Sequence, residues 1–237
     1  MTAASTCATA AHAQLPLLPE TTTQFVPDVR LSNETTLSRF AYAGIGAPAH
    51  REPSPFSRRV GRLRFRTEMG FAEPYLLLRT AVDSRGRQWV QVRLAGRPNG
   101  RTGWVVRPAL SRFHVVRTQL LINRKTLRAT LFRDGKRIWR SPIGVGQPGT
   151  PTPSGKFVVR EKFRVRPSGG LYGPYAFGTS AYSVLSDWPK GGVVGVHGTN
   201  QPRLIPGRPS HGCVRVPNAN IRRLIRLMPV GTPILIL

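Results

Sequence analysis

Glycine and proline occur throughout this chain, with 24 Gly and 22 Pro among its 237 residues. Glycine weakens helix interiors and proline breaks them, so this composition favours short strands joined by turns over long helices. Apolar residues still make up 40% of the chain, which is enough to build a core. A chain of this length can form one large domain or two modest ones. We therefore expect a mainly β protein.

The chain is strongly basic, with 36 Lys and Arg against 10 Asp and Glu and a formal net charge of +26. The surplus is spread from Arg30 to Arg226 rather than gathered in one tail. Such a field concentrates polyanions near the surface, whether nucleic acid, anionic lipid or an anionic cell-wall polymer. Charge alone does not choose among these partners, and a basic surface that is merely solvated remains the alternative.

The N-terminal segment predicts export. Residues 1–13 are rich in Ala and Thr, and Ala11-His12-Ala13 has the small-x-small form of a signal-peptidase site. The basic and apolar parts of a signal peptide are missing, so we interpret residues 1–13 as the remnant of a signal whose start would lie upstream. A disordered terminus is the alternative. No apolar run approaches the ~20 residues that a membrane span needs, so no transmembrane segment is expected.

Cysteine usage supports a catalytic thiol. The chain contains only Cys7 and Cys213. Cleavage after Ala13 would remove Cys7 and leave a single thiol that can form no internal disulfide. A solitary thiol in an exported protein needs a reason, and catalysis is one.

Two regions precede the C-terminal half. Residues 14–59 are rich in Pro, Thr and Ser without apolar periodicity, which predicts a disordered linker acting as an extended tether. Residues 60–112 show short strands at 75–82, 88–94 and 102–106, separated by Gly-containing turns. This pattern resembles a small bacterial SH3-like β-barrel, which implies a wall-binding or spacer role. A module that only packs against its neighbour is the alternative.

Longer strands follow in residues 113–237, which we assign to a second domain. Asp134-Gly135 predicts a hairpin turn, because Gly tolerates the positive φ that the turn needs. Residues 218–228 have Ile, Leu and Met at helical spacing opposite three arginines, which predicts one amphipathic helix. The expected strands are 118–123, 127–132, 136–143, 156–163 and 231–237, with a Pro/Gly loop at 144–155.

The decisive segments are Val194-Gly-Val-His-Gly-Thr-Asn200 and Ser210-His-Gly-Cys-Val-Arg-Val216. A thiol with a free pKa of ~8.5 is mostly protonated at neutral pH, so a nucleophilic cysteine needs an imidazole or a positive environment. His197 ends an apolar strand and can turn toward Cys213 once the intervening loop folds back. Backbone N–H groups at a tight turn before Cys213 can converge on the oxyanion of acyl transfer, each contributing about 2.7–4 kcal/mol. Gly212 has no Cβ to block the substrate.

Three other interpretations compete with this one. Cys213 alone is more often a small buried apolar side chain than a nucleophile. His197, His211 and Cys213 are potential zinc ligands, but they lack the usual paired spacing. Gly-rich phosphate binding lacks Walker or Rossmann spacing.

The order His-Gly-Thr-Asn, loop, Ser-His-Gly-Cys-Val-Arg resembles the signature of YkuD-type L,D-transpeptidases, and Gly149-Thr-Pro-Thr-Pro-Ser-Gly-Lys-Phe157 resembles their upstream loop and strand. The resemblance implies a β-sandwich or barrel catalytic fold with a short helix. It implies Cys213 as nucleophile and His197 as base, with the amides around His211, Gly212 and Cys213 as the oxyanion hole. Ser210 and Arg215 match positions that shape and brace the site, and the Gly198 carbonyl would orient the imidazole.

The same resemblance implies crosslinking of peptidoglycan stem peptides during cell-wall biogenesis, with release of a terminal D-alanine from a tetrapeptide stem. No metal or organic cofactor is expected, and we expect a monomer located at the cell wall outside the cytoplasm. Anionic wall polymers are an additional expected partner. Water or a D-amino acid as acceptor would give carboxypeptidase or exchange activity, and a noncatalytic wall-binding protein is the more distant alternative. No specific nucleic acid is expected, because stacking aromatics and a recognition motif are missing.

Overall fold

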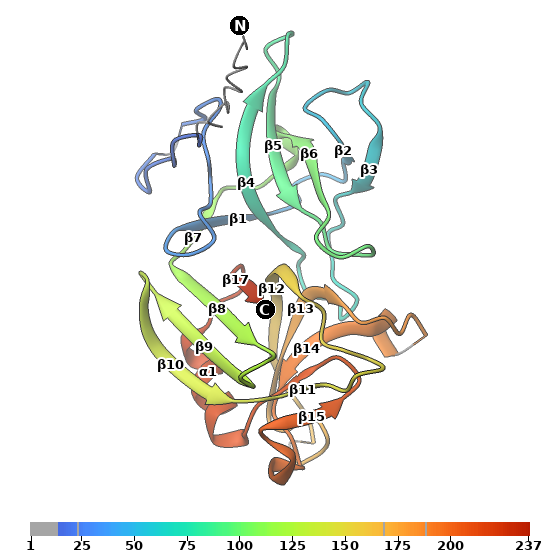
Figure 1. The fold of residues 1–237 in the computed structure, drawn as a ribbon. Coiled ribbons are helices and arrows are strands. Elements are labelled where there is room, and N and C mark those ends of the chain that lie inside the picture. Colours follow the sequence, from blue (N-terminus) through green and yellow to red (C-terminus); the bar gives the residue numbers. More distant parts are fainter. Residues whose placement is uncertain (1–13, 23, 168, 188) are drawn as a thin grey trace, which may run out of the picture.

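The computed structural model describes residues 14–22, 24–167, 169–187 and 189–237. These residues form two β-sheets, one stacked above the other along the long axis of the molecule (Figure 1). Residues 14–116 form the N-terminal unit and residues 117–237 the C-terminal unit. The expectation of a mainly β protein is confirmed. No helix among the described residues is long and apolar enough to cross a membrane, and the predicted signal remnant, with Cys7, lies outside them.

The N-terminal unit is a seven-stranded antiparallel sheet in the order β3-β2-β6-β5-β4-β1-β7. Its core includes Leu31, Leu77, Val90 and Val105, all fully buried. The SH3-like assignment of residues 60–112 stays a prediction. The strands are β1 (Ser38–Tyr42), β2 (Pro48–His50), β3 (Arg59–Arg62), β4 (Pro74–Val82), β5 (Gln88–Arg93), β6 (Thr102–Val106) and β7 (His114–Val116), with a 3-10 turn at Arg107–Ala109.

The described part of residues 14–59 is folded, so the predicted disordered linker is wrong. This segment supplies β1, β2 and the start of β3, and buries Leu18 and Leu31 in the core. Arg39 in β1 is 2% exposed and donates to the main-chain oxygens of Leu18 and Leu31, both at 2.8 Å. These hydrogen bonds from a buried guanidinium fix the segment on the core, although its sequence lacks the apolar periodicity that usually indicates a folded segment. The sheet also extends past residue 112, because β7 pairs with β1, so the boundary between the units lies near residue 117.

The C-terminal unit is a ten-stranded mixed sheet in the order β10-β9-β8-β17-β12-β13-β14-β16-β11-β15. The predicted hairpin at Asp134-Gly135 is confirmed, with φ angles of 51° and 74°. The predicted helix is α1 (Asn218–Leu227), which buries Ile221 and Leu224. The strands are β8 (Thr118–Asn123), β9 (Arg128–Arg133), β10 (Lys136–Pro142), β11 (Gly144–Gly146), β12 (Gly155–Arg164), β13 (Tyr175–Tyr182), β14 (Val193–His197), β15 (Gly207–Ser210), β16 (Val214–Arg215) and β17 (Pro233–Ile236).

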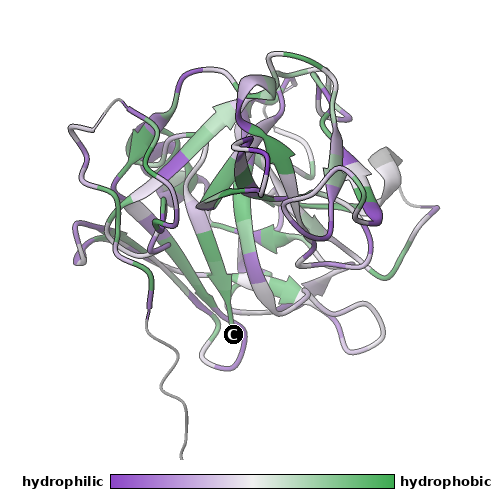
Figure 2. Cartoon of the chain, turned by 90° about the horizontal axis from the view of Figure 1, so that it is seen from above, coloured by the Kyte–Doolittle hydropathy of each residue, from purple (hydrophilic) through white to green (hydrophobic). Residues whose placement is uncertain are grey.

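Hydrophobic residues are concentrated in the strands of both units, and many of the hydrophilic residues lie in the connecting loops (Figure 2). One apolar cluster unites Leu120, Phe157, Phe177, Val196 and Val214 across the C-terminal sheet. These residues come from β8, β12, β13, β14 and β16, so packing in the core holds side by side the strands that carry the His197 and Cys213 segments. This packing positions the candidate site.

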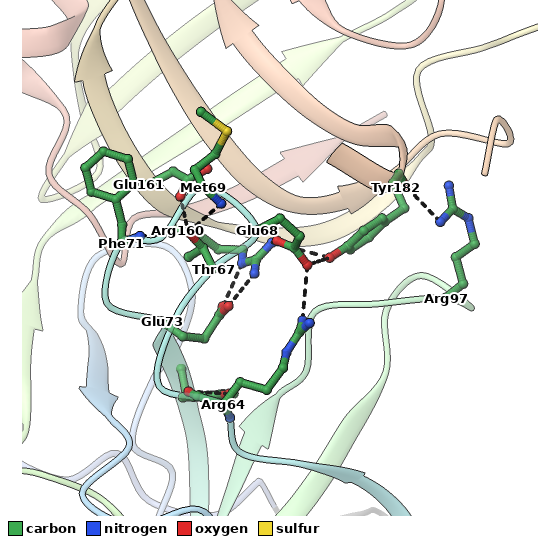
Figure 3. Close-up of polar contacts among 12 residues, drawn as sticks. Arg64, Thr67, Glu68, Met69, Phe71, Glu73, Arg97, Arg160, Glu161 and Tyr182 are labelled. Carbon is green, nitrogen blue, oxygen red and sulfur yellow. Dashed lines mark hydrogen bonds and ion pairs between the residues drawn. The ribbon is translucent and has the colours of Figure 1, made fainter. Parts of the chain in front are cut away.

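A polar seam joins the two units (Figure 3). Arg160 in β12 is 1% exposed, and its guanidinium pairs with Glu73 and with Glu68, the latter at 2.8 Å. Thr67 donates to Glu161, and Phe71 stacks on Phe163 with ring centroids 5.7 Å apart. The loop between β3 and β4 is therefore clamped onto the C-terminal sheet.

The pKa of Glu68 shows whether burial or the neighbouring polar groups dominate in this seam. Burial acts to raise the pKa of Glu68, but a hydrogen bond from Tyr182 and the charge of Arg160 outweigh it and lower that pKa to about 2. The pKa of this carboxyl is lower in the folded protein than in the unfolded chain, so its ionised form stabilises the fold at pH values above the unfolded pKa. This stabilisation is lost as the pH falls from the unfolded pKa to the folded pKa. The seam therefore weakens in acid, between about pH 4.5 and pH 2.

Replacing Glu73 with Gln should lower the free energy of unfolding by about 3 kcal/mol, because it removes the charge that faces the fully buried Arg160. Urea unfolding followed by circular dichroism measures this loss. The control is Asp134→Asn, which removes an ion pair whose two side chains are each nearly half exposed and should barely move the midpoint. Equal shifts in the two variants would contradict the structural role assigned to the seam.

Candidate active site

Parallel pairing of β14 with β16 brings the two predicted segments together. Val196 lies opposite Val214, and His197 lies opposite Arg215. Cys213 directly precedes β16, so its side chain reaches the end of β14 that carries the imidazole. A Cβ placed on Gly195 would lie 3.7 Å from His197 Cδ2 and 3.9 Å from Cys213 Sγ, which shows that the two side chains flank the same glycine. The structure thus unites the predicted thiol and imidazole.

His197 is held as a neutral imidazole. Its Nδ1 lies 2.6 Å from the main-chain oxygen of Gly198, an acceptor only, so Nδ1 carries the proton and Nε2 keeps a lone pair. Burial lowers the pKa of His197 to about 4; the charge of Arg215 acts in the same direction, and the bond to Gly198 opposes it. The predicted role of the Gly198 carbonyl in orienting the ring agrees with this contact.

Cys213 is held as a thiol. Its sulfur accepts a hydrogen bond from the Gly195 amide at 3.3 Å, and the residue is partly exposed. Burial raises the pKa of Cys213, while the Gly195 amide and the charge of Arg215 act to lower it. With the imidazole pKa lowered and the thiol pKa raised, the resting pair is neutral rather than a thiolate beside an imidazolium.

The turn before Cys213 is locked by Ser210. The Ser210 hydroxyl donates to the Cys213 main-chain oxygen at 2.6 Å and accepts from the Gly212 amide at 3.2 Å. The Gly212 amide, which the family resemblance places among the oxyanion donors, is therefore already engaged. Gly212 has φ +124°, and a Cβ there would lie 3.0 Å from Ser183 Oγ, so this position requires glycine. Thr152 from the predicted Pro/Gly loop donates to the Gly212 main-chain oxygen at 2.8 Å.

Arg215 places a buried positive charge beside the reacting groups. Its guanidinium donates to Gln201 at 2.7 Å, its Nε has no hydrogen-bond partner, and it forms no ion pair with any described residue. The side chain is only 7% exposed. An unpaired cation here favours negative charge on the sulfur or on a substrate carbonyl. This placement fits the predicted bracing role and adds an electrostatic one.

Two cavities reach the thiol and the imidazole. A small one of about 40 Å³ is lined by Tyr172, Ser183, His211 and Arg215 as well as the pair itself. A larger one of about 370 Å³ runs along Phe163 and Phe177 toward the N-terminal unit, where Glu68 and Met69 form part of its wall.

Sequence reasoning missed several residues that shape the site. Tyr172 packs edge-on against His197, with ring centroids 4.8 Å apart, and lines both cavities. Its position in a glycine-rich loop was the only available signal. Asn218 at the start of α1 accepts from the Thr199 amide at 2.9 Å and so fixes the loop after His197. Glu68 and Met69 could not be assigned to a site at all, because they lie in the other unit.

His211 is exposed and lines the small cavity, and it does not join His197 and Cys213 in a metal site. No group of three or more His, Cys, Asp or Glu side chains arranged to hold a metal ion occurs among the described residues. The zinc interpretation therefore finds no geometric support in the described part of the chain.

Comparison with known proteins decides the family. The family model described as the YkuD L,D-transpeptidase catalytic domain matches residues 117–236. The chain belongs to the YkuD family of L,D-transpeptidase catalytic domains. The match begins where the N-terminal sheet ends, so this family accounts for the C-terminal unit, and the N-terminal unit is an addition to it.

Two Bacillus relatives carry the name L,D-transpeptidase YkuD. The B. licheniformis protein is 32% identical over 49% of this chain and 62% of its own length. The B. subtilis protein is 34% identical over 48% of this chain and 62% of its own length. The chain thus spans less than two thirds of these relatives.

Solved structures of L,D-transpeptidases are also similar. The Enterococcus faecium catalytic domain is 26% identical and covers 51% of this chain and 96% of its own, with a TM-score of 0.38. L,D-transpeptidase 3 of Mycobacterium tuberculosis is 14% identical and covers 70% of this chain and 91% of its own, with a TM-score of 0.45.

The neutral pair in this YkuD domain predicts a specific pH profile for thiol alkylation. The rate of Cys213 alkylation by iodoacetamide should rise steadily with pH beyond about 8.5, because only the thiolate reacts and burial raises the pKa of this thiol. Mass spectrometry of the Cys213 peptide measures the rate, with glutathione as the reference thiol. A fast plateau between about pH 5 and 8 would reveal a thiolate–imidazolium pair instead.

Proposed function

We propose that the chain is a peptidoglycan L,D-transpeptidase in which Cys213 is the nucleophile and His197 the general base. The observation that carries this proposal is the position of both side chains around Gly195, at the meeting point of two cavities. Family membership supports an acyltransferase of the cell wall. The substrate is a tetrapeptide stem that ends in D-alanine.

In the first step, His197 Nε2 takes the proton of the Cys213 thiol as the sulfur attacks the carbonyl between the third residue, an L-centre, and the terminal D-alanine. The tetrahedral oxyanion forms beside the Cys213 amide, with the charge of Arg215 nearby. When this intermediate collapses, the C–N bond breaks, and His197 returns the proton to the nitrogen of the departing D-alanine. A thioester on Cys213 remains, and the imidazole is neutral again.

In the second step, an amine from a neighbouring stem attacks the thioester. His197 accepts a proton from the amine, the C–S bond breaks, and the proton passes to the sulfur. The thiol and a new amide crosslink result. The neutral resting pair suits both halves, because Nε2 is free to accept a proton each time and the ring never has to stay charged.

The two cavities support separate routes for the two stems. One stem would occupy the cavity that reaches Cys213 from one side while the acceptor amine enters through the other. Water or a free D-amino acid that reaches the thioester first would give carboxypeptidase or exchange activity on the same stem.

The N-terminal unit, which we propose is SH3-like, would hold the enzyme on the wall. Its loop also forms a wall of the larger cavity through Glu68 and Met69, so its role includes substrate selection. Location at the wall fits this role, because the crosslinked polymer lies outside the cytoplasm. The surplus of basic residues suits the anionic polymers there.

Intact-mass analysis with a tetrapeptide stem tests the function. The wild-type chain should gain the mass of the tripeptide acyl group and release D-alanine, while Cys213→Ala should gain nothing. His197→Gln should slow acylation about 10²- to 10⁴-fold, the usual effect of losing a general base. Cys7→Ser is the matched control and should acylate like the wild type. Acylation that survives in Cys213→Ala would eliminate the proposal.

A further inference from the structure

A cavity of about 570 Å³ lies between the two units, apart from the reacting groups. Its walls come from the loop that leads into β4, from the turn between β5 and β6, and from the end of β13. Four arginines line it: Arg62, Arg64, Arg97 and Arg101. No lysine contributes, and the only acidic lining residues are Glu68 and Glu73.

The positive charges of the arginines in this cavity are not neutralised by the two carboxylates that line it. Glu73 pairs with Arg160, and Glu68 pairs with both Arg160 and Arg64 (Figure 3). By contrast, Arg62, Arg97 and Arg101 form no ion pair with any residue that the structure describes. The two carboxylates are thus already engaged. The hydrogen bonds of the three arginines go to main-chain oxygens: Arg62 donates to Gly46 at 3.3 Å, Arg97 to Gly191, Ser183 and Leu185, and Arg101 to Arg97.

These arginines are held in place. Arg97 donates to the main-chain oxygens of Gly191 at 2.9 Å and Ser183 at 2.7 Å, and it stacks over the Tyr182 ring. Arg101 donates to the Arg97 main-chain oxygen at 3.0 Å. Positions fixed in this way reduce the entropy lost when an anion binds.

Two glycines in the cavity wall lie directly beside the Arg101 guanidinium. A Cβ on Gly61 would lie 3.4 Å from one Arg101 guanidinium nitrogen, and a Cβ on Gly96 would lie 3.5 Å from the other. Both residues line the cavity. The Arg101 guanidinium therefore lies close against bare backbone, where a larger residue at either position would crowd it.

The cavity adjoins the active site. Tyr182 and Gly191 line it, while the next residues, Ser183 and Gly192, line the small cavity at Cys213. The Ser183 amide also donates to the Gly192 main-chain oxygen at 2.8 Å, so the two segments form one thin wall between the sites. A polymer whose stem reaches Cys213 would pass close to the arginines.

We propose that this arginine-lined cavity is a binding site for carboxylate- or phosphate-bearing segments of cell-wall polymers. The planar guanidinium fork matches both groups in a bidentate manner, which favours them over anions of other shapes. Three arginines without a carboxylate partner among the described residues line this cavity, and their positive charge suits a ligand with several negative charges. The choice of a wall polymer rests on the proposed function, whereas the anion site rests on the cavity alone.

Direct binding tests the site with two probes: a soluble peptidoglycan oligomer that carries stem carboxylates, and a poly(glycerol phosphate) chain of similar charge. The test variant is Arg62→Ala/Arg101→Ala, which spares Arg97 because that residue also holds the two units together. The matched control is Arg222→Ala/Arg223→Ala, which removes the same charge from the exposed face of α1. Isothermal titration calorimetry at two salt concentrations measures the Kd.

The test variant should bind at least one probe about tenfold more weakly than the wild type, because charge-assisted hydrogen bonds are lost, and the control should stay within about twofold. The probe that shows this difference identifies carboxylate or phosphate as the ligand. Equal losses in both variants would show that net charge alone attracts the probes and would overturn the site, as would no binding of either probe to the wild type. Because acylation by a short tetrapeptide does not involve Arg62 or Arg101, the test variant should still acylate, so failure of this site and failure of the chemistry at Cys213 are separate results.

Discussion

The parallel pairing of β14 with β16 is the constraint on which the site depends. It brings His197 at the end of β14 close to Cys213, which directly precedes β16, and the residue that both flank, Gly195, has no side chain to separate them. Residues far apart in the sequence hold this arrangement: Thr152 bonds to the turn at Gly212, and Asn218 at the start of α1 bonds to the loop after His197. Because these hydrogen bonds are formed without substrate, the groups are already in position where negative charge would develop.

Burial decides the protonation state of that site. The same desolvation that lowers the pKa of the imidazole raises the pKa of the thiol, so both effects favour the uncharged pair. The charge of Arg215 lowers the pKa of the thiol, against the effect of burial, and lowers the pKa of the imidazole, in the same direction as burial. This charge has no carboxylate partner among the described residues. The arrangement favours the protonated thiol at rest, and the charge of Arg215 would stabilise negative charge that develops near the sulfur.

Features that depend on neighbouring residues in the sequence could be predicted, and features that depend on contacts between distant residues could not. The Asp134-Gly135 turn, the amphipathic helix at Asn218 and the His and Cys segments were predicted, because turn chemistry, periodicity and motif each lie within a few residues. Residues 14–59 were misjudged, because their order depends on pairing with distant strands and on Arg39 binding distant carbonyls. The place of Glu68 and Met69 in the wall of the larger cavity at Cys213, and the arginine-lined cavity, both depend on how the two units pack together. No local pattern in a single sequence predicts that contact.

Nitrogen-15 NMR of the His197 ring tests the central claim most directly, since it reports the tautomer and the pKa of the same imidazole. A protonated Nδ1 beside an unprotonated Nε2 at neutral pH, with titration near pH 4, is the result predicted by the bond to Gly198 and by burial. A ring protonated on both nitrogens at neutral pH would contradict the neutral pair, and with it the account of how Cys213 becomes a nucleophile.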